Sequence, residues 1–200
     1  MKIGITLNEV LRDFLGQLVY TYDKYYEKTD LTQDDITSFE LLDYFDFKDK
    51  NELNKFLYFE ASLEIFGHAD QYYDNIFNRF NAFLMDMQDE EEHQIKIVSR
   101  EFNKSIPSTC FFLSKVGCRA TNIEFVKNYE DKWENVDVLI TANPIALENK
   151  PAGKISVKVN TKYNTDVEAD FSIDSIVDFM DDSSLRESIL NTKITSFEEI

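Results

Sequence analysis

Polar residues follow two short apolar strands that the sequence predicts, and they are the first candidates for a functional site. The strand at residues 2–7 carries Thr6 near its end and is followed by Asn8, and the strand at residues 136–140 is followed by Thr141. In α/β folds, ligands and reactive groups lie at the carboxyl ends of the strands. Neither edge carries a pair of aspartates. The two edges therefore resemble an active site from which the acids have been removed.

Cysteine and histidine add little chemistry to these edges. Two cysteines, Cys110 and Cys118, cannot build a disulfide framework or a four-ligand zinc site, and we expect both to be small buried apolar residues. His68 and His93 each follow a predicted helix end, and neither has a second imidazole nearby in the sequence. We therefore expect no zinc site and no catalytic triad.

The charge of the chain excludes some classes of partner. The formal net charge is −17, whereas a site for a phosphate backbone needs clustered Lys and Arg. We therefore expect no direct contact with nucleic acid and no docking on anionic membranes. No apolar run approaches the roughly 18 residues of a membrane span, and no basic-then-apolar leader opens the chain. The expectation is a soluble protein that is not secreted through a signal peptide.

A long helical region follows the first strand. Between residues 11 and 92 there is no proline, and apolar residues recur at i, i+3 and i+4, which is the spacing of amphipathic helices. The predicted helices cover residues 11–26, a segment capped by Thr32, residues 52–66 and residues 70–89. We interpret residues 13–92 as an all-helical cap inserted after the first strand.

The pattern changes after His93, where predicted strands alternate with helices. Strands are predicted at residues 94–99, 122–126, 136–140 and 154–159, and helices at residues 106–116 and 172–180. This alternation predicts an α/β fold with a Rossmann-like, mostly parallel sheet that the first strand joins across the insertion. The core would comprise residues 1–12 and 93–180. Residues 181–200 would form a tail with a short helix around residues 185–190.

Four features occur in order along this core. They are a strand that ends in Thr6-Leu7-Asn8, a strand that ends in Ser99, a lysine before the next core strand (Lys132, with Lys127 as its rival), and a strand followed by Thr141-Ala142. Their order and strand context, together with the helical insertion, resemble the haloacid dehalogenase-like (HAD) phosphatase superfamily with a helical cap. The small bacterial and phage nucleotidase-like members are the most similar.

This resemblance implies a site that lacks the catalytic and metal-binding aspartates of the family. In the family, one aspartate attacks phosphorus and a second acts as acid and base, while the first and a late acidic pair hold magnesium. The matching positions here are Thr6, Asn8, Thr141 and Ala142. The resemblance therefore implies a pseudoenzyme with no catalytic residue, no metal ligand and no cofactor. Ser99 and Lys132 would remain as a weak phosphate-binding pair.

A fold that has lost its catalytic residues can still bind other proteins through its surface. We therefore expect a structural or interaction component of a larger assembly. Asn, Lys, Ile, Asp, Phe and Tyr are common and Gly and Pro are scarce, which is typical of AT-rich genomes such as those of many phages. This usage favours a bacteriophage virion protein, found in the virion or host cytoplasm, whose partners are other protein subunits.

Three alternatives remain open from the sequence. One is a magnesium-dependent phosphatase or 5′-nucleotidase with a rearranged site, in which Glu9 or Asp13 supplies the missing carboxylate. Another is a non-catalytic binder of a phospho-ligand. The third is an unrelated α/β domain.

Overall fold

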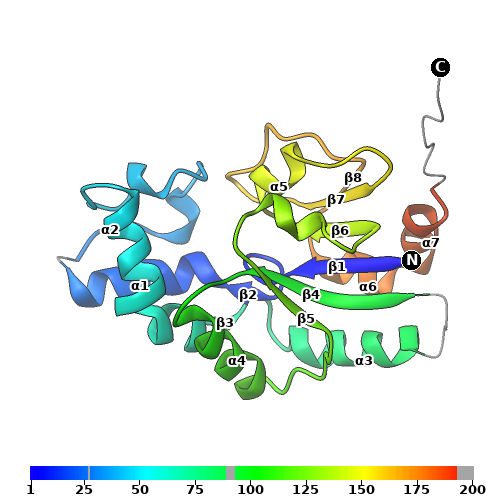
Figure 1. The fold of residues 1–200 in the computed structure, drawn as a ribbon, viewed down its shortest axis with the longest axis horizontal. Coiled ribbons are helices and arrows are strands. Elements are labelled where there is room, and N and C mark those ends of the chain that lie inside the picture. Colours follow the sequence, from blue (N-terminus) through cyan, green and yellow to red (C-terminus); the bar gives the residue numbers. More distant parts are fainter. Residues whose placement is uncertain (27, 89–92, 193–200) are drawn as a thin grey trace.

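The computed structural model describes residues 1–26, 28–88 and 93–192 and shows an α/β fold around one six-stranded sheet (Figure 1). The strand order is β5-β4-β1-β6-β7-β8, and every neighbouring pair is parallel. The strands are β1 (Lys2–Thr6), β4 (Gln94–Arg100), β5 (Ile123–Val126), β6 (Val138–Thr141), β7 (Ile155–Val159) and β8 (Phe171–Ile173). The predicted parallel sheet is confirmed, and β1 joins it between β4 and β6.

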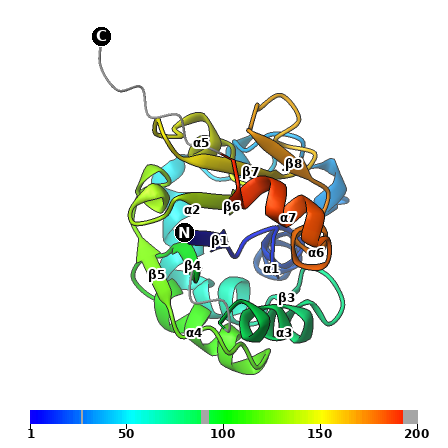
Figure 2. The ribbon, with the colours of Figure 1, turned by 90° about the vertical axis from the view of Figure 1, so that its right-hand side faces the viewer.

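Helices cover both faces of the sheet because successive strand residues point to opposite sides. One face carries Ile3, Ile5 and Ile97, which share an apolar cluster with the longer helices. These are α3 (Ile76–Gln88), α4 (Ser105–Lys115), α6 (Ile176–Asp181) and α7 (Ser183–Leu190). The opposite face carries Val98 and Leu139 under the 3₁₀ turn η5 (Glu130–Trp133) and the short helix α5 (Pro144–Glu148). Figure 2 shows α3, α4 and α6 on the side of the sheet opposite to α5.

Residues 14–67 form a second lobe with its own apolar cluster. Its elements are α1 (Phe14–Tyr25), the 3₁₀ turns η1 (Gln33–Asp35) and η2 (Leu41–Asp43), α2 (Lys50–Lys55), and the π-helical segments η3 (Phe56–Glu60) and η4 (Leu63–Gly67). The chain enters and leaves this lobe through an antiparallel ribbon of β2 (Arg12–Asp13) and β3 (Asp70–Gln71). Both connections to the sheet therefore run side by side, and the lobe lies beyond the end of β1 (Figure 1).

Two helices predicted for this lobe are wrong in detail. The segment after Thr32 forms one 3₁₀ turn with a capping box rather than a full helix. The apolar residues that suggested a helix serve different partners, because Ile36 is buried inside the lobe while Phe39 contacts Tyr129 and Tyr163 of the sheet domain. The helix predicted at residues 52–66 is divided into α2, η3 and η4.

The last predicted helix of the insertion also needs correction. The residues at 70–71 pair with β2, so the helix expected at residues 70–89 begins only at Ile76. The apolar side of this helix, α3, packs against the sheet and not within the second lobe. By its packing, α3 therefore belongs with the sheet, although it lies within the segment 13–92 expected to be the cap. Residues 89–92 lie outside the described residues.

The carboxyl-terminal half of the chain shows three further differences from expectation. Residues 171–173 form the edge strand β8, whereas a helix was predicted from residue 172; the helix α6 starts after the Ser175 capping box. The helix α5 was not predicted, although Asn143 and Pro144 form an ordinary helix start. Cys110 is exposed and Cys118 half-buried, so the expectation of two buried cysteines is wrong.

The segment expected to be a tail contains α7, which is part of the packed structure, while residues 193–200 lie outside the described residues. The Ile189 side chain is fully buried in the cluster that α3 and α6 share with the sheet. The Arg186 guanidinium donates to the carbonyls of Phe179 and Met180 and thereby ties α7 to the end of α6.

Replacing Ile189 by Ala should lower the free energy of unfolding by about 2–4 kcal/mol, because a buried aliphatic side chain is removed and a cavity remains. Ser188→Ala in the same helix is the matched control, since Ser188 is exposed and its replacement should change stability by less than about 0.5 kcal/mol. Urea unfolding followed by circular dichroism measures both. Equal midpoints for the two variants would show that α7 does not stabilise the fold.

Candidate functional site

A cavity of about 240 Å³ lies at the carboxyl edge of the sheet, between the sheet and the second lobe. The sheet domain contributes mainly polar residues to its lining, namely Thr6, Asn8, Glu9, Ser99, Arg100, Tyr129, Lys132, Asn143 and Tyr163. The second lobe contributes mainly apolar residues, including Phe14, Leu15, Ile36, Phe39, Leu53, Leu57 and Tyr58. The cavity therefore has one polar and one largely apolar wall.

The fold brings together most of the site residues that the sequence analysis selected. Thr6, Asn8, Ser99 and Lys132 all line the cavity. Thr141 lies directly behind Thr6, because the Thr6 hydroxyl donates to the Thr141 hydroxyl over 3.1 Å. The strands that carry Ser99, Thr6 and Thr141 are neighbours in the sheet, which places their carboxyl ends side by side, while Lys132 comes from the turn η5. Ala142 is fully buried and is not part of the cavity lining.

The end of β6 is occupied by structural hydrogen bonds. The Thr141 hydroxyl accepts from the Asn143 backbone N–H over 3.1 Å. The Asn143 side chain in turn accepts from the Ala146 N–H over 2.8 Å and caps α5. The carbonyl of Ala142 accepts from the Asn164 amide, which anchors the loop after β7. These groups hold the strand end and its loop in place.

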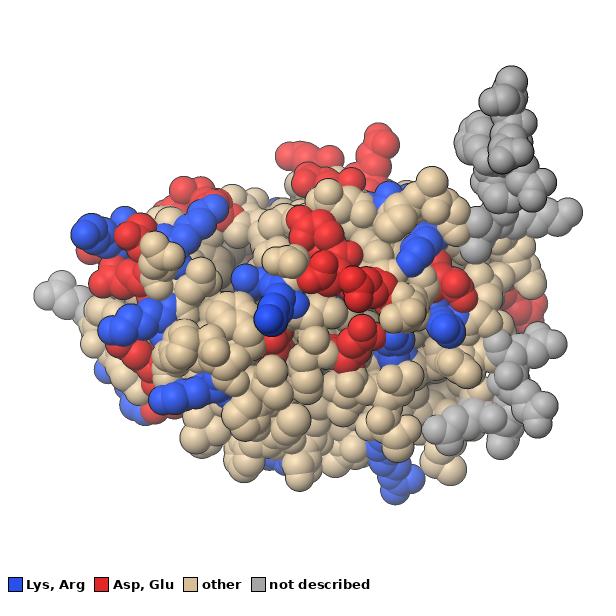
Figure 3. Space-filling view, viewed as in Figure 1, with Lys and Arg blue, Asp and Glu red and all other residues tan. Residues whose placement is uncertain are grey.

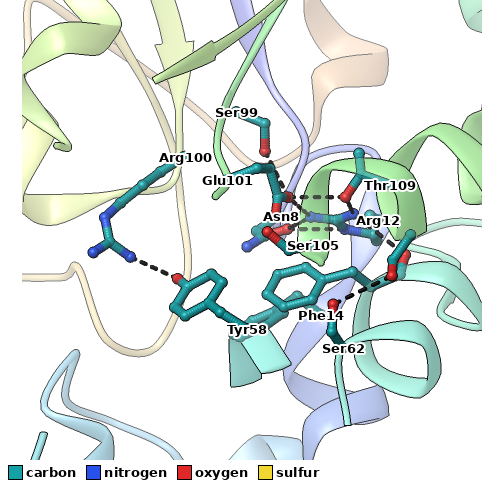
Figure 4. Close-up of polar contacts among 12 residues, drawn as sticks. Asn8, Arg12, Phe14, Tyr58, Ser62, Ser99, Arg100, Glu101, Ser105 and Thr109 are labelled. Atoms are coloured by element: carbon teal, nitrogen blue, oxygen red, sulfur yellow. Dashed lines mark hydrogen bonds and ion pairs between the residues drawn. The ribbon is translucent and has the colours of Figure 1, made fainter. Parts of the chain in front are cut away.

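A fully buried arginine, which is not itself part of the cavity lining, holds residues of the polar wall in place (Figure 4). The Arg12 guanidinium donates through Nε and Nη2 to the Asn8 side-chain oxygen, over 3.0 and 2.6 Å. Its Nη2 also donates to Glu101 Oε1 over 2.6 Å, and its Nη1 donates to Thr109 Oγ1 over 2.7 Å. The Ser99 hydroxyl donates to the same Glu101 oxygen over 3.1 Å. Asn8 and Ser99 are therefore held in one ion-pair network.

Sequence reasoning missed both charged residues of this network. Arg12 follows the turn after β1, and Glu101 follows β4 by one residue. Nothing in the local spacing links residues 89 positions apart. The sequence could have indicated them only by their positions, because each residue follows a strand that ends at the edge where the polar residues lie.

Glu9 is the one carboxyl group on the polar wall. It adopts a left-handed backbone conformation with φ of 54°, and its Oε1 accepts from the Phe14 and Leu15 N–H groups at the start of α1. Burial raises the pKa of Glu9 to about 8, which outweighs the opposing effect of the two N–H groups and of Arg12. At neutral pH this carboxyl is therefore mostly protonated.

Asp13, the second carboxyl group considered for a rearranged metal site, has a structural role. Its Oδ1 accepts from the Gly16 N–H over 3.0 Å and caps α1, and it is absent from the cavity lining. Within residues 1–26, 28–88 and 93–192, no group of three or more His, Cys, Asp and Glu side chains is arranged to hold a metal ion.

Two cationic side chains, Arg100 and Lys132, belong to the polar wall of the cavity, and a third, Lys50, lines the opposite wall in an ion pair with Glu40. Lys132 lies in η5 and is 6% exposed, and its Nζ lies 5.3 Å from the centre of the Tyr129 ring. The Arg100 guanidinium lies 4.7 Å from the same ring and donates to the Tyr58 hydroxyl over 2.6 Å. Burial and the charge of Arg100 lower the pKa of Lys132 to about 7, against the weaker effects of Glu101 and Glu9.

Lys132 and Lys127, the two candidates for the lysine of the third motif, lie in different surroundings. Lys132 lines the cavity, whereas Lys127 is exposed and is not part of the lining. The backbone around Lys132 is fixed on both sides. The side chain of Asp131 accepts from the Asn128 N–H, and the Trp133 indole donates to the Ala146 carbonyl over 2.7 Å. The arrangement can therefore hold a small anion beside Lys132 and Arg100.

Comparison with known proteins gives no further guidance. No protein-family model matches the chain, and no curated protein matches it in sequence. In the part of the chain that the structure describes, none of the helices combines the length and apolar character needed to cross a membrane.

Replacing Glu9 by Gln should stabilise the protein at pH 8 and leave it nearly unchanged at pH 5. The folded state keeps the Glu9 proton up to a pKa of about 8, whereas the unfolded chain releases it near 4.5, so this group lowers stability as the pH rises between these values. Glutamine keeps an oxygen for the two N–H groups and carries no charge. We expect a gain of roughly 1–3 kcal/mol at pH 8.

Urea unfolding of both proteins at pH 5 and pH 8 measures this effect. Glu168→Gln is the control, because Glu168 is exposed and its replacement should shift stability equally at both pH values. A Glu9→Gln variant that is less stable than the parent at pH 8 would mean that Glu9 is ionised in the folded protein.

Proposed function

We propose that this chain is a HAD-like domain that has lost its catalytic carboxylates and binds a phosphate-bearing ligand without turning it over. One observation carries the proposal. Thr6, Asn8, Ser99 and Lys132, which stand at motif positions, line one cavity, and Lys132 and Arg100 face it from a polar wall whose one carboxyl, Glu9, is mostly protonated. Glu40 and Lys50 line the other wall, where they form an ion pair with each other and add no net charge. A buried site with excess positive charge suits an oxyanion.

The same contacts argue against turnover. Thr6 is hydrogen-bonded to Thr141 and has no base beside it in the network described above. The Asn8 side-chain oxygen accepts twice from Arg12, and an amide does not exchange protons at neutral pH. Glu9 is the remaining carboxyl on the polar wall, and its Oε1 already accepts two backbone N–H groups. A rearranged magnesium site would require these groups to move.

The purified chain should release no phosphate from nucleotides or small phosphomonoesters, with or without magnesium, and should bind sulfate. Sulfate is a useful probe because its charge does not change between pH 6 and pH 8.5. Binding requires charged Lys132, so the affinity should fall about 10-fold or more over this range as the side chain passes its pKa of about 7. Isothermal titration calorimetry measures the affinity.

Lys132→Met and Lys127→Met form a matched pair for this test. The first should weaken sulfate binding at pH 6 and remove most of its pH dependence, and the second should change neither, since Lys127 is exposed and outside the cavity lining. Magnesium-dependent phosphate release that a chelator abolishes would contradict the proposal. So would equal sulfate affinity in the two variants.

A second function, as an interaction component of a larger assembly, is favoured by the surface. Large apolar side chains are exposed on η3, η4 and α4, namely Phe59 at 44%, Leu63 at 52% and Phe111 at 45%. The surface over α4 and towards α3 carries few charged residues in the view of Figure 3. On a chain of net charge −17, an uncharged face with exposed aromatic groups is a natural contact surface. Residue usage makes a bacteriophage virion our proposed assembly.

If this face is a contact surface, the chain produced in its native host should sediment with a particle far heavier than its own 23.5 kDa. A double variant, Leu63→Ser with Phe111→Ser, should sediment as the free chain, because both exposed apolar groups are removed from the face. Tyr20→Ser is the control, since Tyr20 is also exposed but lies on α1, outside α3, α4 and η4. A parent chain that sediments alone would contradict the assembly function.

A further inference from the structure

We propose that Lys132 is a reactive amine that forms an imine with a small aldehyde or ketone bearing a phosphate or carboxylate group. The inference goes beyond anion binding, because it assigns covalent chemistry to this side chain. It does not depend on the resemblance to any family. Four observations support it.

The first observation is that Lys132 lacks the partners that keep other buried lysines charged. Three lysines are buried in the described part of the chain, and they are Lys96, Lys132 and Lys158. Lys96 forms an ion pair with Glu124, and the Lys158 ammonium donates to the Val167 carbonyl over 2.8 Å. Among the described residues, the Lys132 ammonium has no hydrogen-bond acceptor and no ion-pair partner, and it lies near the Tyr129 ring. The residue lines the cavity, so its nitrogen is not engaged by another protein group there.

The second observation is a neighbouring cation. Arg100 and Lys132 lie over the same Tyr129 ring, so each positive charge disfavours the other. The charged and titratable groups that act on Lys132 are Arg100, Glu101 and Glu9, and with burial their sum leaves its pKa at about 7. About half of Lys132 is then free amine at pH 7, whereas an ordinary lysine has about one part in 2,500. Desolvation and a neighbouring cation are the usual means of activating a lysine for imine formation.

The third observation is a proton donor in the same cavity. Imine formation begins when the Lys132 nitrogen attacks the carbonyl carbon; the carbonyl electron pair moves to oxygen, which takes up a proton as nitrogen loses one. The carbon–oxygen bond then breaks, and the hydroxyl leaves as water with a proton from an acid. Glu9 is such an acid, because it keeps its proton near neutral pH and its Oε1 accepts two N–H groups, which leaves the proton on Oε2.

The fourth observation concerns the size and charge of the site. A cavity of about 240 Å³ admits a molecule of a few carbon atoms with one charged group. The Arg100 guanidinium lines the cavity beside Lys132 and can pair with a phosphate or carboxylate. A carbonyl compound that carries such a group would be held with its carbonyl carbon near the amine. An uncharged aldehyde would not be held in this way.

Reductive trapping on the full chain tests the inference. The protein is incubated at pH 7 with glyoxylate and cyanoborohydride, which reduces any imine to a stable secondary amine, and the modified lysines are mapped by peptide mass spectrometry. Lys132 should be modified at least about 10-fold faster than exposed Lys127 and than the partnered, buried Lys96 and Lys158. Acetaldehyde, which lacks the carboxylate, should show a smaller preference for Lys132.

Two variants test the roles of the amine and of the proton donor. Lys132→Arg should remove the fast adduct while the other lysines react as before. Glu9→Gln should slow the modification of Lys132 about 10-fold without affecting Lys127, because glutamine cannot donate the proton. Modification of Lys132 at no more than the rate of Lys127 in the folded parent chain would overturn the inference.

Sulfate separates this inference from the function proposed above. An excess of sulfate should protect Lys132 but not Lys127 if both proposals hold. Sulfate binding without fast modification of Lys132 would overturn the imine alone. Fast modification of Lys132 that sulfate does not slow would support the imine and contradict the phosphate-binding function.

Discussion

The buried ion pair of Arg12 and Glu101 is the interaction on which the rest of the site depends. Both side chains are completely removed from solvent, and the pair joins the turn after β1 to the end of β4. The Arg12 guanidinium also donates to the Phe66 carbonyl over 3.3 Å, at the end of the second lobe. Removing one partner of such a pair leaves an uncompensated buried charge and costs about 3–5 kcal/mol. The Arg12–Glu101 ion pair therefore helps to fix the position of the second lobe relative to the sheet.

This pair also determines the charge that the cavity can accept. Glu101 forms its ion pair with Arg12, and its attraction for Lys132 is weaker than the opposing effects of burial and of Arg100. Glu9 is too deeply buried to supply the missing charge at neutral pH. The cavity therefore keeps an excess of positive charge, although the chain as a whole is strongly acidic. The proposed anion binding rests on this excess, whereas the lowered pKa of Lys132 has burial as its main cause and the charge of Arg100 as its second.

Much of the fold could be predicted from the sequence, because parallel strands and amphipathic helices leave local patterns. The polar ends of the strands at residues 2–7 and 136–140 correctly indicated a shared edge, and Ser99, which was selected through the family resemblance, lines the same cavity. The second lobe was predicted less well. Its apolar residues pack through irregular turns, as when Phe39 leaves the lobe to contact Tyr129 and Tyr163. Periodicity cannot reveal a contact that joins distant elements.

The same limit explains why the centre of the site was missed. Arg12 and Glu101 stand in unremarkable local sequence, and their importance arises only when β1 and β4 become neighbours.

The residue at position 8 is physically linked to the buried arginine. Position 8 contacts Arg12 through two hydrogen bonds, and an amide oxygen satisfies these without adding charge. An aspartate there would place a second carboxylate on an arginine that Glu101 already neutralises, and a magnesium ion beside Asn8 would face the buried guanidinium. A chain with Arg12 at this point is thus better matched to Asn8 than to an acid. Under the HAD-like interpretation, a resident guanidinium has replaced the bound metal as the cation that organises the strand ends. On the same interpretation, this exchange would explain why an amide and not an acid stands at position 8.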